Sequence, residues 1–366
     1  FDEMSVADNI AMNKLIKDGK PLTNKKDIQK IATDTLNLIG VDIPLDAKIQ
    51  ELSIANRQLI AICRALALDA KLLFMDEPTT ALTKNEVDRL LDIVLSLKAR
   101  NIAVVFISHK LDEVMRIADS ITVIRDGHKI GDYAASEMDP HKLAYYMTGR
   151  EVTYQQYERN CKENENLLEI KHLCKEGNFQ NISLDVRKGD ILGLTGLLGA
   201  GRTELALSLF GLNKPDSGEI YIEGKKVSIT CPQDAIDHGI GLVPEERAIQ
   251  GLFLSKSVNE NVGAAILKRL TGFIGTINQN KSRTLAKEAI GQFRIKVYNE
   301  DTLINTLSGG NQQKALIARW AASHPKIFIL DTPTVGIDIG SKSEIYEYIQ
   351  SFAKQGIGVI IISDEV

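Results

Sequence analysis

An internal repeat divides this sequence of 366 residues. Three segments of the first half recur in the second half, each at residue numbers 255 higher. The pairs are Leu52–Leu66 with Leu307–Ala321, Lys71–Leu82 with Lys326–Ile337, and Ala103–His109 with Gly358–Asp364. Unbroken register over three segments predicts two copies of one domain, so we expect a tandem fold rather than one large domain.

The same alignment predicts the domain boundaries. We expect a first domain over residues 1–152, a linker over the polar stretch 153–166, and a second domain over 167–366. Ser5–Ile10 also matches Ser257–Val262, at an offset of 252. Extending both copies to equal length predicts that the first lacks about 85 residues at its start and the second about 40 at its end. We therefore expect a fragment cut inside both domains.

The apolar residues follow an α/β pattern, in which short buried strands alternate with helical periodicity. We predict strands at Leu72–Met75, Val104–Ile107, Ile191–Thr195, Ile327–Leu330 and Gly358–Ile362, and helices that include Glu86–Ala99 and Ser341–Ala353. This alternation predicts mainly parallel sheets flanked by helices.

A glycine-rich turn, GLLGAGRT, follows the predicted strand Ile191–Thr195. Its glycines would let backbone N–H groups surround a phosphate at the start of the next helix. Thr203 is placed to hold Mg²⁺, and Arg202 stands where such a P-loop has lysine. Arginine keeps the charge but is bulkier, so this loop alone also allows an ordinary strand-to-helix turn. We assign Gly196, Gly199, Ala200, Gly201, Arg202 and Thr203 to phosphate binding.

Acidic residues end two predicted strands. Asp76 and Asp331 are placed to hold a metal ion at the carboxyl ends of these strands. Glu77 follows Asp76 and suits a base that orients or deprotonates water. In the second copy the same position is Thr332, which cannot accept a proton at neutral pH. A strand cap is the structural alternative for either turn.

Two further positions, His109 and Glu245, are candidates for contacts with the same ligand. His109 ends a buried strand 32 residues after Glu77, where we expect it to contact a terminal phosphate, whereas its counterpart Asp364 would repel one. Glu245 lies in a turn after the strand-like run GIGLV and is a weaker candidate.

The segment LSGGNQQ lies at a predicted helix start. Backbone amides at such a start can bind a phosphate, and a glycine pair permits close approach. The first copy has Ser53, Ile54 and Ala55 instead, whose side chains should hinder that approach. We assign Ser308, Gly309, Gly310 and Gln312 to phosphate binding.

Composition limits the possible functions. The net charge of −4 argues against a nucleic-acid binder with a basic face. The longest apolar runs are far shorter than the roughly 18 residues needed to span a bilayer. The four cysteines form no metal-binding or disulfide pattern.

In this order, the P-loop, the LSGG segment, the Asp-Glu strand ending and the histidine resemble the nucleotide-binding domains of ABC ATPases. Two copies on one chain, with LSGGNQQK, GLLGAGRTEL and Pro-Glu-Glu-Arg, look most like the fused ATP-binding subunits of bacterial carbohydrate importers of the ribose, galactose or xylose type. The resemblance covers essentially the whole chain. It implies ATP and Mg²⁺ as cofactors.

The resemblance also implies that each ATP lies between the P-loop of one domain and the signature helix of the other. One site would combine Asp76, Glu77 and His109 with Ser308, Gly309 and Gly310, and its P-loop would lie outside this chain. The other would combine Arg202, Thr203, Asp331, Thr332 and Asp364 with Ser53, Ile54 and Ala55. We expect this second, degenerate site to bind nucleotide but to hydrolyse it poorly, and the fragment alone to be inactive.

The implied partners are membrane permease subunits and, through them, an extracytoplasmic sugar-binding protein, with no nucleic acid. The implied location is the cytoplasmic face of the membrane, as a peripheral subunit. Two other readings stay open: a soluble twin-domain ABC ATPase that acts on ribosomes or DNA, and a catalytically silent regulatory subunit. The sequence does not reveal the solute. Phe179 is a weak candidate for stacking on adenine and fits the core better.

Overall fold

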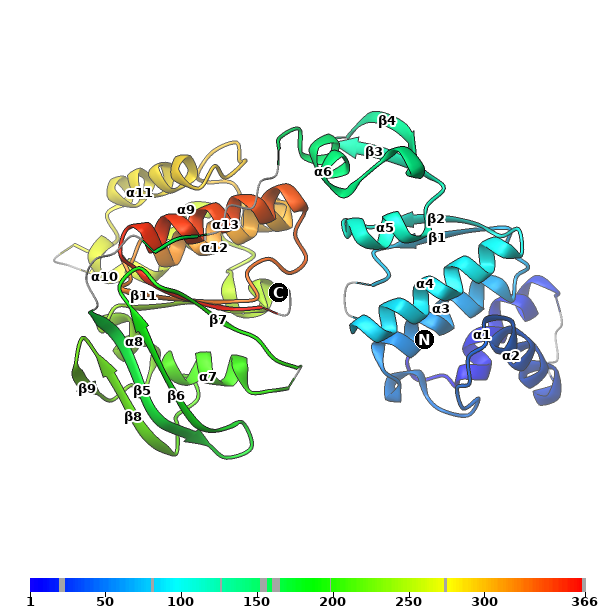
Figure 1. The fold of residues 1–366 in the computed structure, drawn as a ribbon, viewed down its shortest axis with the longest axis horizontal. Coiled ribbons are helices and arrows are strands. Elements are labelled where there is room, and N and C mark those ends of the chain that lie inside the picture. The colour runs from blue at the N-terminus through cyan, green and yellow to red at the C-terminus, as the bar shows by residue number, and fades with distance from the viewer. Residues whose placement is uncertain are drawn as a thin grey trace. The chain divides into compact units, whose positions relative to one another are not determined.

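The computed structural model describes residues 1–19, 24–79, 82–125, 127–151, 157–159, 165–197, 199–272 and 275–363. The chain divides into two compact units, Phe1–Val152 and Thr153–Val366 (Figure 1). Most of the predicted linker and Asp364 lie outside the described residues. Each unit is described by itself below.

Helices and parallel strands make up most of the first unit. Its helices are α1 (Val6–Lys17), α2 (Lys25–Ile39), α3 (Ile54–Leu66), α4 (Lys84–Ala99), α5 (Leu111–Ile117) and α6 (Pro140–Thr148), and its strands are β1 (Leu72–Asp76), β2 (Ala103–Ile107), β3 (Ser120–Arg125) and β4 (His128–Ala134). Strands β1 and β2 pair in parallel, and β3 and β4 form an antiparallel hairpin.

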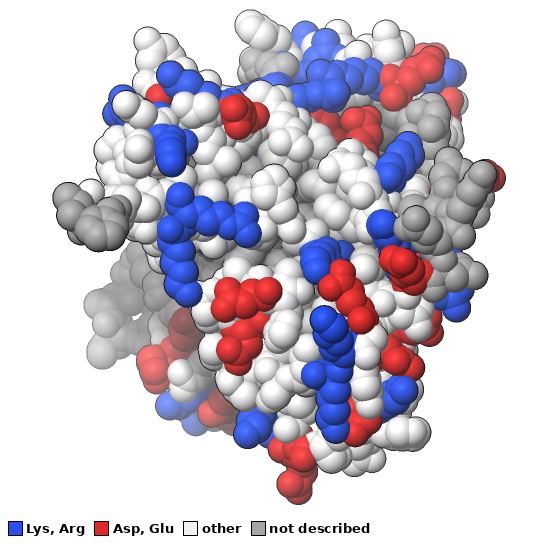
Figure 2. Space-filling view, turned by 90° about the vertical axis from the view of Figure 1, so that its left-hand side faces the viewer, with Lys and Arg blue, Asp and Glu red and all other residues white. Residues whose placement is uncertain are grey.

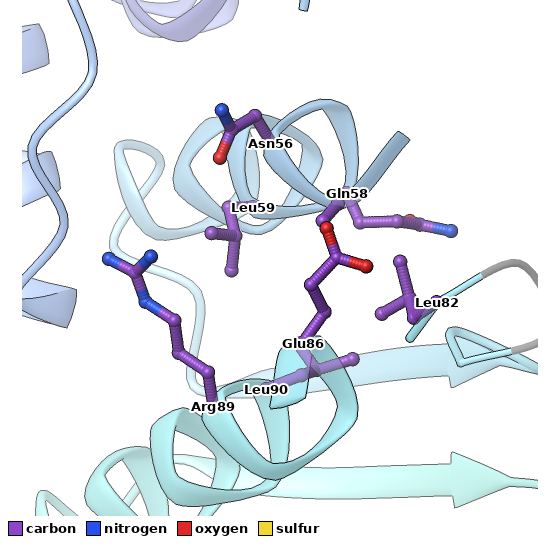
Figure 3. A pocket seen from close by; sticks show the side chains of 8 residues that line it. Asn56, Gln58, Leu59, Leu82, Glu86, Arg89 and Leu90 are labelled. Atoms are coloured by element: carbon purple, nitrogen blue, oxygen red, sulfur yellow. The ribbon is translucent and has the colours of Figure 1, made fainter. Parts of the chain in front are cut away.

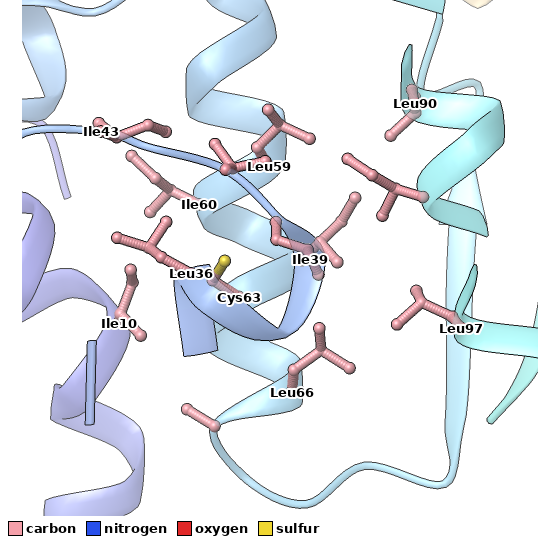
Figure 4. Packing of buried hydrophobic residues seen from close by; sticks show 14 of the residues in the cluster. Ile10, Leu36, Ile39, Ile43, Leu59, Ile60, Cys63, Leu66, Leu90 and Leu97 are labelled. Carbon is pink, nitrogen blue, oxygen red and sulfur yellow. The ribbon is translucent and has the colours of Figure 1, made fainter. Parts of the chain in front are cut away.

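The core of the first unit lies between α1–α4 and one face of β1–β2. Leucine, isoleucine and Cys63 side chains from these elements pack against one another in Figure 4. Ile10, Leu36, Ile60 and Leu97 are almost fully buried. Burial of this apolar surface is the main term that stabilises the helices on the sheet. The β3–β4 hairpin and α6 share a separate small core around Val123.

The second unit has more strands than the first. Its helices are α7 (Arg202–Leu209), α8 (Pro232–Asp237), α9 (Val258–Gly263), α10 (Leu267–Leu270), α11 (Gln279–Gln292), α12 (Gly309–Ala321) and α13 (Ile339–Lys354). Its strands are β5 (Asn166–Lys175), β6 (Phe179–Arg187), β7 (Ile191–Leu194), β8 (Ser217–Ile222), β9 (Lys225–Val227), β10 (Ile240–Val243), β11 (Ile327–Asp331) and β12 (Gly358–Ile362).

Two sheets form the frame of this unit. One is parallel, in the order β10-β11-β12-β7, and the other is antiparallel, in the order β6-β5-β8-β9. One face of the parallel sheet packs with α7 and the antiparallel sheet, and the other packs with α9, α11, α12 and α13 (Figure 1). Phe179 is buried in this core. The prediction of mainly parallel sheets holds for the sheets that contain β1 and β11, whereas the sequence analysis did not anticipate the two antiparallel sheets.

The repeat is present in the strand pairing. Asp76 pairs with Ile107 in the first unit, and Asp331 pairs with Ile362 in the second, 255 residues later at both partners. The carboxyl ends of both strand pairs therefore present equivalent residues at the same register.

Candidate functional site

In the second unit, the glycine-rich turn surrounds a pocket at the carboxyl end of the parallel sheet. The pocket has a volume of about 170 Å³ and is lined by Gly199, Ala200, Gly201, Arg202, Thr203, Glu204, Glu245, Asp331, Thr332 and Ile362. Most of the predicted P-loop, the predicted metal ligands of this unit and Glu245 are thus brought together. Ligands of α/β proteins bind in this position, beyond the carboxyl ends of the strands.

Glycine is required where α7 begins. Gly201 adopts φ +86°, and a Cβ atom there would lie 2.3 Å from the carbonyl oxygen of Asn178. Any larger residue would push the turn away from the β5–β6 hairpin. The close approach leaves the start of α7 open to the pocket, where its N–H groups can face an anion.

Asp331 is buried in the pocket, and its Oδ1 atom has no hydrogen-bond partner. The pKa of Asp331 is raised to about 6, mainly by burial; the hydroxyl of Thr203 and the charge of Arg202 oppose this rise, and the negative charge of Glu245 adds to it. An unsatisfied buried carboxylate oxygen is costly unless a ligand completes it. Its neighbour Thr203 offers a second oxygen, so the two residues fit Mg²⁺, which favours oxygen ligands and shares them with phosphates.

No group of three or more His, Cys, Asp or Glu side chains suited to a metal occurs among the described residues. A metal ion held by Asp331 and Thr203 would share its remaining positions with oxygen atoms of a ligand or water. Arg202 reaches across the turn, where its Nη1 atom donates to the carbonyl oxygen of Ser363 at 3.4 Å. The guanidinium in the lysine position thus lies beside the end of β12.

The equivalent corner of the first unit holds a carboxylate–imidazole pair. Glu77 Oε1 lies 2.7 Å from His109 Nδ1. Glu77 has φ +43° and its N–H donates to the carbonyl of Ile107 at 2.8 Å; Thr332 has φ +42° and donates to Ile362 at 2.9 Å. The two corners therefore share a strained backbone but differ in the side chain that it presents.

Asp76 is exposed, whereas its counterpart Asp331 is 2% exposed. In the second unit the glycine-rich turn covers this carboxylate, and no described residue of the first unit does so. Asp76 and Glu77 thus lie at an open strand end, together with His109.

The LSGG segment begins α12, with Ser308 as its N-cap residue. Gly309 and Gly310 form the first turn, and none of these residues lines the pocket of Asp331. The side-chain amide of Gln312 donates to the carbonyls of Ile304 and Leu307. In the first unit its counterpart Arg57 donates to the carbonyls of Gln50 and Leu52, so this position braces the preceding turn in both units.

A family model described as ABC transporter matches residues 1–80 and 179–335. The chain belongs to the ABC transporter family. The ribose import ATP-binding protein RbsA of Bacillus licheniformis is 39% identical over 368 residues, which covers 100% of this chain and 74% of the relative. The putative ribose/galactose/methyl galactoside import ATP-binding protein of Geobacillus kaustophilus is 41% identical, over 99% of this chain and 72% of the relative.

A third relative, the RbsA protein of Corynebacterium glutamicum, is 42% identical over 99% of this chain and 69% of its own length. The chain is therefore an ABC-type ATPase. None of its described helices is both long enough and apolar enough to cross a membrane. The predicted fold class, two tandem ABC-type α/β domains, agrees with this membership.

Sequence analysis of this ABC protein missed several residues around the site. Arg247 donates to the carbonyls of Val335 and Gly336, just beyond the strand end that carries Thr332. Thr79, which is buried two residues after Glu77, bonds to Glu113. The repeat itself offered one signal, because threonine occupies the position of Thr79 in both copies.

Proposed function

We propose that this chain is the ATP-binding and ATP-hydrolysing part of an importer for a monosaccharide or a related small solute. The named relatives are import ATP-binding proteins for ribose or galactose, and they match almost all of the chain. Partners of this protein would then be membrane permease subunits, fed by an extracytoplasmic binding protein. The protein would lie at the cytoplasmic face of the membrane as a peripheral subunit.

The observation that carries the proposal is the pair of matching corners after β1 and β11. Glu77 is held 2.7 Å from His109 in one corner, and Thr332 takes the place of the carboxylate in the other. Glu77 would accept a proton from the attacking water while His109 fixes its orientation. Thr332 offers no base, so its corner would bind nucleotide and hydrolyse it slowly.

Different residues of the pocket would contact different parts of ATP and its Mg²⁺. N–H groups at the start of α7 would donate to the phosphates, and Arg202 would place a positive charge beside them. Asp331 and Thr203 would hold Mg²⁺, which neutralises phosphate charge when bound. The pairing of each corner with the signature of the other domain, including Ser308, Gly309 and Gly310 beside Glu77, stays a prediction from the resemblance.

The face shown in Figure 2 does not favour the alternative of an ATPase that acts on ribosomes or DNA. On the face shown in Figure 2, Lys and Arg side chains are interspersed with Asp and Glu among the described residues. The net charge of −4 agrees with this mixture. Binding to a polyanion would require a continuous basic surface.

Substitution of Glu77 tests the proposal in the complete polypeptide, including the first P-loop that the resemblance implies. We expect Glu77→Gln to lower ATP turnover by at least about 100-fold while ATP binding is retained, because only the proton acceptor is lost. Glu246→Gln, at an exposed carboxylate outside both corners, is the control and should leave turnover unchanged. Retained turnover in Glu77→Gln would refute the assignment.

Copurification separates the transport role from the alternatives. We expect the complete polypeptide to copurify with a polytopic membrane protein and not with ribosomes. The reverse result would overturn the import function and leave the ATPase assignment standing.

A further inference from the structure

A cluster of three residues, of which Thr79 and Glu113 are buried, lies next along the chain to Glu77 and His109. The hydroxyl of Thr79 donates to Glu113 Oε2 at 2.6 Å, and the ammonium of Lys110 donates to the carbonyl of Thr79 at 3.1 Å. Lys110 Nζ also lies 3.4 Å from Glu113 Oε1, which closes the ring of contacts. Thr79 is therefore held at both its hydroxyl and its carbonyl. We call Thr79, Lys110 and Glu113 the clamp.

The clamp joins the two chain segments that carry the carboxylate–imidazole pair. Thr79 lies two residues after Glu77, and Lys110 follows His109 directly. Glu113 is in the first turn of α5, which begins right after Lys110. A displacement of either segment would therefore break contacts within the clamp.

Burial makes these contacts strong. Thr79 is 1% exposed and Glu113 is 7% exposed. A buried carboxylate is tolerated only when it is paired and hydrogen-bonded, and Glu113 has both kinds of partner. Loss of the Thr79 hydroxyl would leave one carboxylate oxygen without its donor, which costs more than the same loss at the surface.

The clamp stabilises the strained backbone conformation of Glu77. A residue other than glycine at φ +43° is strained and persists only where its surroundings fix it. The N–H bond of Glu77 to Ile107 fixes one side, and the clamp fixes the chain two residues later. Stabilisation of α5 by a negative charge in its first turn does not explain the contacts, since exposed Asp112 already supplies such a charge.

We propose that Thr79 and Glu113 are positioning residues, which keep the carboxylate of Glu77 against His109 in the geometry used for hydrolysis. The inference rests on the proposed role of Glu77 as the base. It adds that the segment after Glu77 and the helix after His109 move together, so a change at either is transmitted to the pair.

ATP turnover of the complete polypeptide tests this role through the hydroxyl of Thr79. Thr79→Val keeps the shape and removes the donor, and we expect it to lower kcat about tenfold while KM for ATP stays within twofold. Thr79→Ser restores the donor and should recover kcat to within twofold of the parent. A purely structural role would lower the amount of folded protein and would not separate kcat from KM.

Two further variants keep the test decisive if Thr79→Val folds poorly. Lys110→Met changes the partly exposed member of the clamp and should lower kcat about threefold, with KM for ATP unchanged. Asp112→Asn, on the same turn of α5, is the matched control and should leave both constants unchanged. If Thr79→Val folds and keeps the kcat of the parent protein, the proposed role of the clamp is wrong. If Thr79→Val does not fold, an unchanged kcat in Lys110→Met refutes the proposal instead.

The proposed role of Glu77 as the base is tested in the same assay. If Glu77→Gln keeps its turnover, the proposed base is wrong and the clamp falls with it. If Glu77→Gln is inactive while Thr79→Val and Lys110→Met are fully active, only the clamp is wrong.

Discussion

The strand pairs β1–β2 and β11–β12 share one register but differ in what covers them. Phe74 of β1 is 70% exposed, whereas its counterpart Ile329 of β11 is fully buried against α7 and the antiparallel sheet. The corner beyond each strand is nevertheless the same, with φ +43° at Glu77 and φ +42° at Thr332. The two corners therefore share the strand pairing, the local Asp-x-Pro-Thr sequence and the backbone conformation.

A second difference separates the helices that cross on the other face. In the first unit α3 and α4 leave a pocket of about 60 Å³, lined by Asn56, Gln58, Leu59, Glu86, Arg89 and neighbours (Figure 3). In the second unit Gly310 takes the place of Ala55, which lines that pocket, and approaches Ser341 so closely that a Cβ atom would lie 2.1 Å from its Oγ atom. The glycine thus allows α12 and α13 to pack closely in the second unit. The pocket between α3 and α4 in the first unit is too small for a nucleotide.

The largest expected effect is at the covered strand. Ile329→Ala removes a fully buried side chain and should lower the free energy of unfolding of the second unit by about 3 kcal/mol. Phe74→Ala, at the equivalent position of this chain, should cost less than about 0.5 kcal/mol. Urea denaturation followed by fluorescence reports on the second unit, because the single tryptophan of the chain, Trp320, lies there. Circular dichroism follows the unfolding of both units. If Phe74→Ala and Ile329→Ala lower the free energy of unfolding equally, then β1 is as well covered as β11.

The next effect is at an arginine that both copies share and that is buried in the second unit. Arg319 donates to Asn261 and to the carbonyl of Gly251 and lies over the ring of Phe253, and burial lowers its pKa to about 10. Its counterpart Arg64 lies over Phe1, with its Nε atom unpaired.

Arg319→Met should therefore cost about 2–3 kcal/mol, because buried acceptors lose their donor. Arg64→Met should cost less than about 1 kcal/mol. Thermal unfolding followed by circular dichroism measures both. A larger loss for Arg64→Met would show that the two arginines do not differ in the way that their contacts indicate.

The close helix crossing gives a third, smaller effect. Gly310→Ala should lower the free energy of unfolding by about 1–2 kcal/mol, because Ser341 and the start of α13 must move. Ala55→Gly, the reverse change, should cost about 0.5–1 kcal/mol through helix propensity alone. Combining Gly310→Ala with Ser341→Gly should recover part of the loss. No recovery in the double variant would place the conflict elsewhere.

The sequence predicted the parts of the site that depend on short-range pattern. The strands that end at Asp76 and Asp331 were found because buried parallel strands are short apolar runs, and the repeat fixed their register. The antiparallel sheets were missed, since their strands mix polar and apolar residues. Thr79 and Glu113 were missed because the bond between them joins residues that lie 34 positions apart, and only the folded chain shows both to be buried. The amide of Gln312 donates to the turn before α12, a contact that the sequence did not indicate, and its assignment to phosphate binding stays a prediction.

The smallest expected effect bears on the difference between Glu77 and Thr332. Thr332→Glu supplies the missing carboxylate at a corner whose backbone already has the right conformation. ATP turnover of the complete polypeptide should nevertheless change by less than about twofold, because Arg202 still takes the lysine position and Ser53, Ile54 and Ala55 still replace the glycine signature. Steady-state phosphate release measures the change, with Thr332→Gln as the uncharged control. A rise well beyond twofold in Thr332→Glu alone would show that the missing base is the sole defect of the second site, and the two corners would then differ in one side chain only.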